Sequence, residues 1–322
     1  MRGRAAVTLP SCPFGGSVSS RSLFARSRTA RALCALVGGS ALVLAGCTTN
    51  EEGGGPNEDA TEVSVEKVDE IAAKLPENIA SSGTLRVGVN VPYAPNEFKN
   101  AQGEIVGFDV DLMDAIASVL GVEAQYNEAD FDRIIPAIEG GTYDLGMSSF
   151  TDTKEREETV DFVTYFSAGS QWAQPAGESV DPNNACGLRV AVQTTTIQDI
   201  EELPAKNQAC LDAGNPPIDI VKYDSQDEAA NAVALGQVDA MSADSPVTAY
   251  AVKQSGDQLE LAGDVFDASP YGWPVAKGSP LAPVLQEAMQ HLIDDGAYRT
   301  ISENWGVQDG MIEESVINGA IS

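Results

Sequence analysis

Apolar and polar residues along the middle of the chain alternate between strand-like and helix-like patterns. The run TLRVGVN (84–90) is rich in β-branched residues and predicts a strand. GFDVDLMDAIASVLG (107–121) has apolar residues three and four positions apart and ends in glycine, which predicts a helix. Residues 131–140 and 143–147 predict a second helix and a second strand. This alternation of strands and helices indicates an α/β fold.

The same pattern occurs twice along the chain. GLRVAVQ (187–193) resembles TLRVGVN, which lies 103 residues earlier, and AVALGQVDAMSAD (232–244) resembles AIEGGTYDLGMSS, which lies 95 residues earlier. In both halves a helix ends at glycine, a strand follows, and small polar residues come after the strand. Two similar β–α–β units predict two α/β lobes, each with helices flanking a largely parallel sheet.

Polar residues stand at the predicted carboxyl ends of the strands in both halves. In open α/β sheets, ligands bind beyond these ends. The ends lie at 90–93, 148–151, 193–196 and 242–244. If the two lobes face each other, these residues form one polar cleft between them.

The first 46 residues have a different composition from the rest. They contain six arginines and no acidic residue, and 32–45 carries no charge. A basic stretch followed by a short apolar stretch is typical of a signal peptide, and it is too short to span a membrane, which takes about 20 residues. The following LAGC (44–47) resembles the lipobox of bacterial lipoproteins and predicts Cys47 as a lipidated N-terminus. The alternative is an ordinary cleaved signal peptide, in which Cys47 has no role.

Residues 47–83 begin with a glycine-rich, acidic stretch. Because such a stretch has little to bury, we expect a lipid-anchored flexible tether over 47–83, in which 65–75 can form a short helix. Two cysteines, Cys186 and Cys210, remain beyond the anchor. Outside the cytoplasm a remaining pair predicts a disulfide, and the alternative is two buried free thiols.

The net charge and the absence of common motifs exclude several classes of function. Lys and Arg number 19 against 48 Asp and Glu, so the net charge is −29, which excludes a nucleic-acid partner. The single histidine excludes a cluster of several histidines on a metal. The chain has none of the common nucleotide-binding, zinc-protease, CxxC or nucleophile-elbow motifs, so we expect neither a cofactor nor a metal. The composition does not exclude an enzyme that uses carboxylates for catalysis, because the chain has many of them.

GFDVDLMDAIASVL (107–120) has glycine, an aromatic residue, two acidic residues and then a predicted helix. This order resembles the signature of family 3 of the solute-binding proteins, the polar-amino-acid receptors of ABC importers. MSSFTDTKEREETVDFVTYF (147–166) is similar to a second characteristic stretch, where a Ser/Thr loop leads to Glu-Arg and Asp-Phe. The resemblance extends over about 84–308.

The resemblance implies a type II periplasmic-binding-protein fold, in which two α/β lobes are joined by a hinge of two crossings and close on a ligand. Lobe 1 would comprise 84–170 plus 274–322, and lobe 2 would comprise 171–273. Trp172 and Trp273 would then lie near the crossings.

The resemblance also implies ligand-binding roles. Arg156 would hold the α-carboxylate of an amino acid, and Asp244, on the other lobe, would hold the α-ammonium group. Ser149 would accept a hydrogen bond from the ammonium group through its backbone, Thr151 would add hydroxyl and N–H contacts, and Thr196 would donate to the carboxylate. The rings of Tyr93 and Phe131 would enclose the ligand side chain, and Asn90 would make a polar contact with it.

Each of these residues also has an interpretation without a ligand. Arg156 lies among glutamates and would ordinarily be a solvated surface residue. Asp244 directly precedes Ser-Pro, a pattern typical of a helix start. Thr151 could belong to a turn, and aromatic residues often serve only the core.

Asn90 stands where receptors for basic amino acids and glutamine often carry Asp. Asn cannot neutralise a cationic side chain, so this position favours an uncharged polar or acidic ligand.

The resemblance implies an extracytoplasmic substrate-binding protein of an ABC transporter and not an enzyme. It would capture a free polar amino acid between its lobes and deliver it to the permease and its ATPase subunits for import. We expect a monomer on the outer face of the cytoplasmic membrane, attached through the N-terminal lipid only. The alternatives are a surface amino-acid sensor of the same fold and an enzyme similar to cyclohexadienyl dehydratase.

Overall fold

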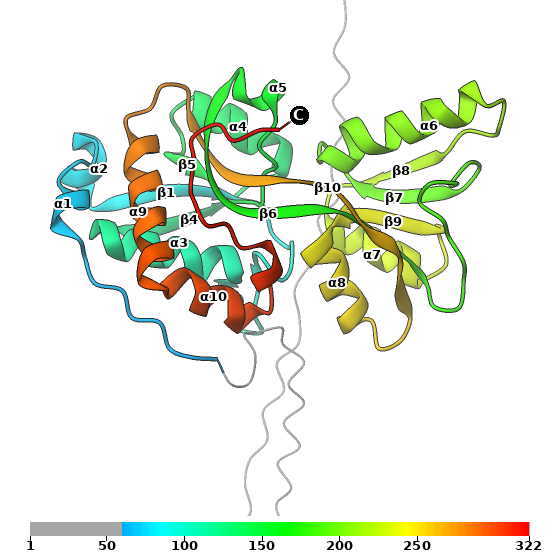
Figure 1. The fold of residues 1–322 in the computed structure, drawn as a ribbon, viewed down its shortest axis with the longest axis horizontal. Coiled ribbons are helices and arrows are strands. Elements are labelled where there is room, and N and C mark those ends of the chain that lie inside the picture. The colour runs from blue at the N-terminus through cyan, green and yellow to red at the C-terminus, as the bar shows by residue number, and fades with distance from the viewer. Residues whose placement is uncertain (1–59, 322) are drawn as a thin grey trace, which may run out of the picture. The chain divides into compact units, whose positions relative to one another are not determined.

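The two predicted lobes share one continuous sheet in the computed structural model, which describes residues 60–321 (Figure 1). The eight strands follow the order β4-β1-β5-β10-β6-β9-β7-β8. The first three belong to lobe 1, the last three to lobe 2, and the two central strands run through both. The sheet strands are β1 (Thr84–Val89), β4 (Glu123–Glu128), β5 (Leu145–Gly146), β6 (Val160–Pro175), β7 (Arg189–Gln193), β8 (Asp219–Tyr223), β9 (Ala240–Asp244) and β10 (Leu259–Ala276).

Lobe 1 is a three-layer arrangement of helices on both faces of its sheet. Strand β1 is parallel to both neighbours, β4 and β5. Leu85, Val87 and Val89 pack into a large core with α3, α9 and α10, while α4 covers the opposite face with Ile134 and Ile138. The helices are α3 (Phe108–Leu120), α4 (Phe131–Glu139), α5 (Lys154–Glu157), α9 (Leu281–Asp295) and α10 (Ala297–Trp305), and a small hairpin of β2 (Phe98–Lys99) and β3 (Ile105–Val106) completes the lobe.

Lobe 2 repeats this plan. Strand β7 lies between the parallel strands β8 and β9. Val190 and Val192 face a cluster with α6, whereas Ala191 faces the other cluster with α7, as the two-residue period of a strand requires. The helices of this lobe are the π-helix η1 (Gln198–Glu202), α6 (Leu203–Asp212), α7 (Gln226–Ala234) and α8 (Ser245–Gln254).

An ion pair at equivalent positions confirms the internal repeat. Arg86 at the start of β1 binds Asp144 through both its backbone N–H and its guanidinium, with Nη2 2.7 Å from Oδ1. Arg189 at the start of β7 binds Asp239 in the same way, also with 2.7 Å between Nη2 and Oδ1. Each arginine thus ties its strand to the residue before the neighbouring strand.

The two long strands β6 and β10 form the crossings between the lobes. They pair antiparallel from Leu259↔Pro175 to Ala276↔Val160, with shifts of register in between. Trp172 lies on β6 and Trp273 on β10, at the crossings, as the resemblance implies, and both side chains are fully buried. The expected lobe boundaries, at 170/171 and 273/274, fall inside these strands.

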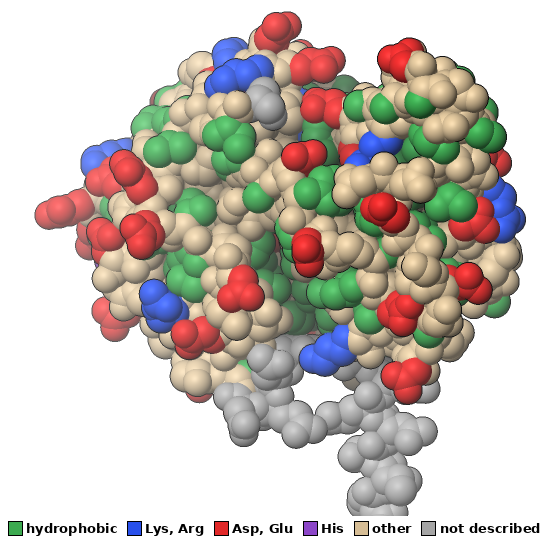
Figure 2. All heavy atoms as spheres, turned by 45° about the vertical axis from the view of Figure 1, so that its right-hand side comes forward, with side chains coloured by type: hydrophobic (Ala, Val, Ile, Leu, Met, Phe, Trp, Pro, Cys, Tyr) green, Lys and Arg blue, Asp and Glu red, His purple; other side chains and the backbone are tan. Residues whose placement is uncertain are grey.

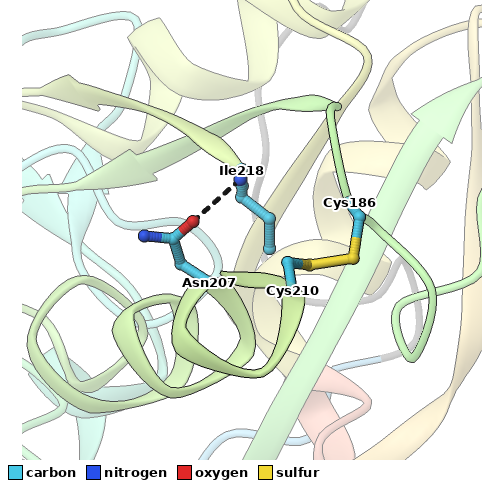
Figure 3. Close-up of a disulfide and its surroundings, with 4 residues drawn as sticks. All are labelled: Cys186, Asn207, Cys210 and Ile218. Atoms are coloured by element: carbon cyan, nitrogen blue, oxygen red, sulfur yellow. Dashed lines mark hydrogen bonds between the residues drawn. A yellow bond between two sulfur atoms is a disulfide. The ribbon is translucent and has the colours of Figure 1, made fainter. Parts of the chain in front are cut away.

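The cysteine pair of lobe 2 is bonded, as the sequence predicts. Cys186 precedes β7 and Cys210 lies on α6, and their sulfur atoms are 2.04 Å apart (Figure 3). On the same helix, Asn207 accepts a hydrogen bond from the backbone N–H of Ile218 at 2.9 Å. The disulfide and this bond attach α6 to the segments that lead into β7 and β8.

The folded body begins earlier than the tether prediction places it. Within 60–83, the short helices α1 (Asp69–Ala72) and α2 (Glu77–Ser82) bury Ile71 and Ile79 against the core of lobe 1. Two isolated isoleucines give too weak a periodic pattern to predict this packing from sequence. The signal peptide, Cys47 and the first part of the tether lie outside the described residues.

The chain after α10 crosses lobe 1 and returns to the hinge. Beyond the short 3₁₀ helix η2 (Gln308–Gly310) it runs alongside β6 and reaches α5, as the red segment of Figure 1 shows. We call residues 315–320 the C-terminal strap. No helix in 60–321 is both long and apolar enough to cross a membrane. Acidic side chains are spread over both lobes on the face drawn in Figure 2, in line with the large negative charge.

Candidate functional site

A small cavity lies where the two lobes meet, and all eight residues predicted to bind a ligand line it. Seven lining residues belong to lobe 1 and five to lobe 2. They are Asn90, Tyr93, Phe131, Ser148, Ser149, Thr151, Arg156, Gln193, Thr196, Ile197, Gln198 and Asp244.

The strand ends explain why these residues meet. Asn90 and Tyr93 follow β1, and Ser148 to Thr151 follow β5 in the neighbouring position of the sheet. Gln193 ends β7 and Asp244 ends β9 in the other lobe. The carboxyl ends of parallel strands meet at one edge of a sheet, so each lobe presents its polar loops to the cavity.

Arg156 lies on the one-turn helix α5, whose N-cap Thr153 accepts a hydrogen bond from the Arg156 backbone N–H at 3.2 Å. The guanidinium donates from Nη1 to the carbonyl of Thr151 at 2.8 Å and from Nη2 to the carbonyl of Thr195, in lobe 2, at 3.0 Å. It also lies 5.8 Å from the ring centre of Phe131. Arg156 is therefore a cation of the cavity and contacts both lobes, unlike a solvated surface residue.

Burial lowers the pKa of Arg156, and the negative charge of Asp244 acts in the opposite direction. An arginine side chain nevertheless stays protonated in proteins. Its planar head has five N–H donors in a fork that matches a carboxylate. The two carbonyl contacts engage only one donor on each terminal nitrogen, so Arg156 can also serve an anionic group in the cavity.

Asp244 is the buried anion of the cavity. Its Oδ1 accepts a hydrogen bond from Gln198 at 2.8 Å, and its Oδ2 accepts one from the Tyr93 hydroxyl at 2.7 Å. Burial raises the pKa of the Asp244 carboxyl, while the hydrogen bonds and Arg156 oppose the shift. Helix α8 does begin directly after Asp244, as its sequence suggests, but the carboxylate makes no capping bond to it.

Asn90 joins the lobes on another side of the cavity. Its Nδ2 donates to the carbonyl of Ala129 at 3.0 Å, and its Oδ1 accepts a hydrogen bond from Nε2 of Gln193 at 2.9 Å. Gln193 in turn donates to the carbonyl of Asp224 at 3.2 Å. Two carboxamides, which can each donate and accept, thus face this end of the cavity.

The remaining predicted residues line the cavity while also serving the local fold. Phe131 stacks on Phe150, with ring centres 4.3 Å apart. The Thr196 hydroxyl donates to the carbonyl of Gln193 at 2.7 Å and shapes the turn before η1. Ser149 adopts a positive φ of 49° and accepts a hydrogen bond from Asn96 at 2.8 Å.

Two buried carboxyls lie directly behind the cavity serines. Glu97 accepts a hydrogen bond from Ser148 at 3.0 Å, and Asp109 accepts one from Tyr165 at 2.7 Å and one from Ser149 at 3.2 Å. The two carboxyls also lie close to each other, and burial raises the pKa of both. Two carboxyls buried so close together disfavour the state in which both are ionised.

Four lining residues are not among the eight that the sequence predicts to bind a ligand: Ser148, Gln193, Ile197 and Gln198. The strand-end rule covers Ser148 and Gln193, because both fall within the predicted strand ends. Gln198 lies on the π-helix η1, for which the sequence gives no signal. Within 60–321, no group of His, Cys, Asp and Glu residues could hold a metal ion.

Known proteins are similar to this chain in sequence and in fold. The model of the bacterial extracellular solute-binding proteins, family 3, matches residues 85–308. The arginine-binding protein ArgT of Corynebacterium glutamicum is 42% identical over 292 residues, which cover 89% of this chain and 96% of ArgT. The glutamine-binding protein GlnH of an ABC transporter of Bacillus subtilis is 30% identical over 278 residues, which cover 83% of this chain and 93% of GlnH.

A solved structure agrees with these relatives. An ancestral arginine-binding protein bound to arginine superimposes with a TM-score of 0.64 at 35% identity, covering 69% of this chain and 98% of that protein. The shared sheet, the two crossings and the cavity between the lobes are those of the type II periplasmic-binding-protein fold. The chain belongs to family 3 of the bacterial extracellular solute-binding proteins.

Proposed function

We propose that the protein captures a free amino acid in the cavity between its lobes and delivers it to the permease of an ABC importer. The observation that carries the proposal is the presence of Arg156 and Asp244 in one cavity, on opposite lobes. Every free amino acid has a carboxylate that suits a guanidinium and an ammonium group that suits a carboxylate. A ligand held by both lobes stabilises their closed arrangement over an open one, and this arrangement is what the permease would recognise.

Arginine is the ligand that we propose. ArgT and the ancestral protein, both named for arginine, support this choice. The carboxamides of Asn90 and Gln193 can accept hydrogen bonds from a guanidinium. The lining has one cation, Arg156, and one acidic side chain, Asp244, and two further carboxyls lie directly behind Ser148 and Ser149. This excess of acidic groups favours a ligand with a net positive charge.

This choice differs from the uncharged or acidic ligand that Asn90 favours on sequence grounds. That argument considers only the charge at position 90. In the structure, the carboxyls of Glu97 and Asp109 lie directly behind Ser148 and Ser149. A cationic ligand therefore has acidic groups close to the cavity even without Asp at position 90.

A calorimetric binding panel tests both parts of the proposal. The protein is unfolded and refolded to remove carried-over ligand and is then titrated with each of the twenty amino acids. We expect arginine to bind most tightly, and a ligand at 100 times its Kd to raise the unfolding free energy by about 2.7 kcal/mol. Tighter binding of glutamine would overturn arginine as the ligand. If no amino acid binds, the receptor role itself is wrong.

The proposal includes binding without chemical conversion. The named relatives are binding proteins, which supports this. Mass spectrometry of the ligand released after a long incubation should return the same amino acid unchanged. A stoichiometric or catalytic loss of the amino acid would instead show an enzyme.

We further propose, from sequence alone, that residues 1–46 are a signal peptide and that Cys47 carries a lipid anchor on the outer face of the cytoplasmic membrane. Wild-type protein expressed in a bacterium should remain with the membrane fraction and carry acyl chains at Cys47. Cys47→Ser should release it. Equal release of both forms would disprove the anchor and leave the binding role untouched.

A further inference from the structure

The C-terminal strap (315–320) lies beyond residue 308, where the match to the family ends, yet it is closely bound to the hinge strand β6. The backbone N–H of Thr164 donates to the carbonyl of Val316 at 2.9 Å, and the hydroxyl of Ser315 donates to the carbonyl of Thr164 at 2.7 Å. Asn318 adds a side-chain contact by accepting a hydrogen bond from the backbone N–H of Phe162 at 2.9 Å. The strap therefore has a defined position on lobe 1.

Two consecutive backbone amides of the strap bind two acidic side chains next to the cavity. The Gly319 N–H donates to Oδ2 of Asp152 at 2.7 Å, and the Ala320 N–H donates to Oε1 of Glu157 at 3.1 Å. Asp152 directly follows the cavity residue Thr151, and Glu157 directly follows Arg156. The strap thus contacts both ends of the turn that presents Arg156.

This turn needs support from outside. Its only regular element is α5, which has four residues, and a single helical turn is not stable by itself. Besides the Thr153 cap and the bonds from the Arg156 guanidinium to the carbonyls of Thr151 and Thr195, the turn is held by three outside contacts. These are the backbone bond from Asp152 to the carbonyl of Pro270, the bond from Lys277 to the carbonyl of Glu157, and the strap.

The charges of the turn make the strap contacts more important. Asp152 is fully buried, and burial together with the nearby charge of Glu157 raises the pKa of its carboxyl. Two acidic groups so close together repel each other when both are ionised. Backbone N–H donors from the strap offset this repulsion, with Lys154, which also binds Glu157, as the neighbouring cation.

We propose that the C-terminal strap is a positioning element of the ligand site, which fixes Arg156 by binding Asp152 and Glu157 on either side of it. The strap touches no ligand itself. It acts through the orientation of the guanidinium, which must match the planar carboxylate of an amino acid to bind it with two hydrogen bonds. This inference rests on the proposed function, because it needs a ligand carboxylate at Arg156.

The test compares arginine binding to the wild type with that of two strap variants. One lacks residues 315–322, and the other is Asp152→Ala, which removes the acceptor of Gly319 and leaves the strap in the chain. Glu314→Gln is the matched control, because its exposed side chain lies just before the strap. We expect about tenfold weaker binding in both strap variants, an unchanged Kd in the control, and partial recovery in Asp152→Asn, which keeps an acceptor.

A double-mutant cycle separates positioning from general destabilisation. Arg156→Lys keeps the positive charge but has no planar fork, so its position relative to a carboxylate matters less. In this background the strap variants should weaken arginine binding less than twofold. An equal loss in both backgrounds, or wild-type Kd values in Asp152→Ala, would overturn the inference. If the shortened chain does not fold, Asp152→Ala decides.

Failure of the inference can be told apart from failure of the proposed function. If wild-type protein binds no amino acid, the receptor role is wrong. If the wild type binds arginine and Asp152→Ala binds it equally well, only the role of the strap is wrong.

Discussion

The hydroxyl of Tyr93 in lobe 1 donates a hydrogen bond of 2.7 Å to the carboxylate of Asp244 in lobe 2, across 151 residues of sequence. The bonds from Gln193 to Asn90 and from Arg156 to the carbonyl of Thr195 connect the lobes in the same region. The residues that line the cavity are therefore also the ones that hold the lobes together around it. Under the proposed function, ligand binding and lobe closure would therefore depend on the same side chains.

Replacing Tyr93 by phenylalanine keeps the ring and removes this bond. A hydrogen bond to a charged group contributes about 1.5–3 kcal/mol, so we expect arginine to bind roughly 10–100-fold more weakly. Titration calorimetry gives the Kd. Tyr126→Phe is the matched control, because the Tyr126 hydroxyl binds Asp114 within lobe 1. Tighter binding in Tyr93→Phe would mean that the hydroxyl competes with the ligand ammonium.

Arg156→Ala should abolish amino-acid binding and leave the fold intact. Its guanidinium contacts two backbone carbonyls and the faces of two aromatic rings, and its loss leaves the hydrophobic clusters of lobe 1 in place. Circular dichroism and a melting curve check the fold. Arg133→Ala serves as the control, because Arg133 pairs with Asp130 on the exposed side of α4. Wild-type affinity in Arg156→Ala would contradict the assignment of the carboxylate site.

Removal of the disulfide should destabilise lobe 2. Cys186 and Cys210 are 24 residues apart, and closing a loop of that size in the unfolded chain corresponds to about 3 kcal/mol of unfolding free energy. Urea unfolding of the double variant Cys186→Ser, Cys210→Ser, compared with the wild type, measures the change. An unchanged transition midpoint would show that the bridge has no stabilising effect.

The raised pKa of Asp152 predicts that the protein becomes less stable as the pH rises. Burial, followed by the proximity of Glu157, raises its pKa to about 7 in the folded protein, against about 3.9 for an unperturbed Asp. The folded state then binds more protons than the unfolded state between these values, so this contribution is complete below about pH 4 and is lost as the pH rises through 7. Lys154, the other charged group near it, acts against the shift.

Urea unfolding between pH 4 and pH 8 checks this prediction. Asp152→Asn cannot titrate, so its unfolding free energy should fall less steeply with rising pH than that of the wild type. Glu314→Gln, with its exposed side chain, should follow the wild-type curve. Parallel curves for Asp152→Asn and the wild type would disprove the raised pKa.

The sequence predicts the regular parts of the structure well, because each rests on a local pattern. The strand of 84–90 and the helix of 107–121 appear as β1 and α3, and Gly121 has the expected left-handed conformation, with φ of 66°. The strand-end rule places Asn90 and Asp244 at one cavity because it describes a property of every open α/β sheet. Their roles toward a ligand stay predictions.

Parts that depend on contacts between distant segments were not predictable from local patterns. Ile71 and Ile79 become buried only because lobe 1 offers them a surface. The strap has no periodic pattern, and its bonds to β6 and Asp152 come from its backbone. Gln198 reaches Asp244 because the chain forms a π-turn there, and no residue type specifies such a turn.

Each of the two crossings contains a tryptophan, whose fluorescence is an intrinsic probe. The protein has three tryptophans, of which Trp172 and Trp273 lie on β6 and β10. The indole of Trp172 donates to the carboxylate of Glu202 at 2.6 Å, and that of Trp273 stacks on Tyr165 with ring centres 4.6 Å apart. Indole emission depends on such neighbours, so we expect a rotation of the lobes about these strands to change the intrinsic fluorescence. Such a change on addition of arginine would report the lobe closure proposed above without an attached dye.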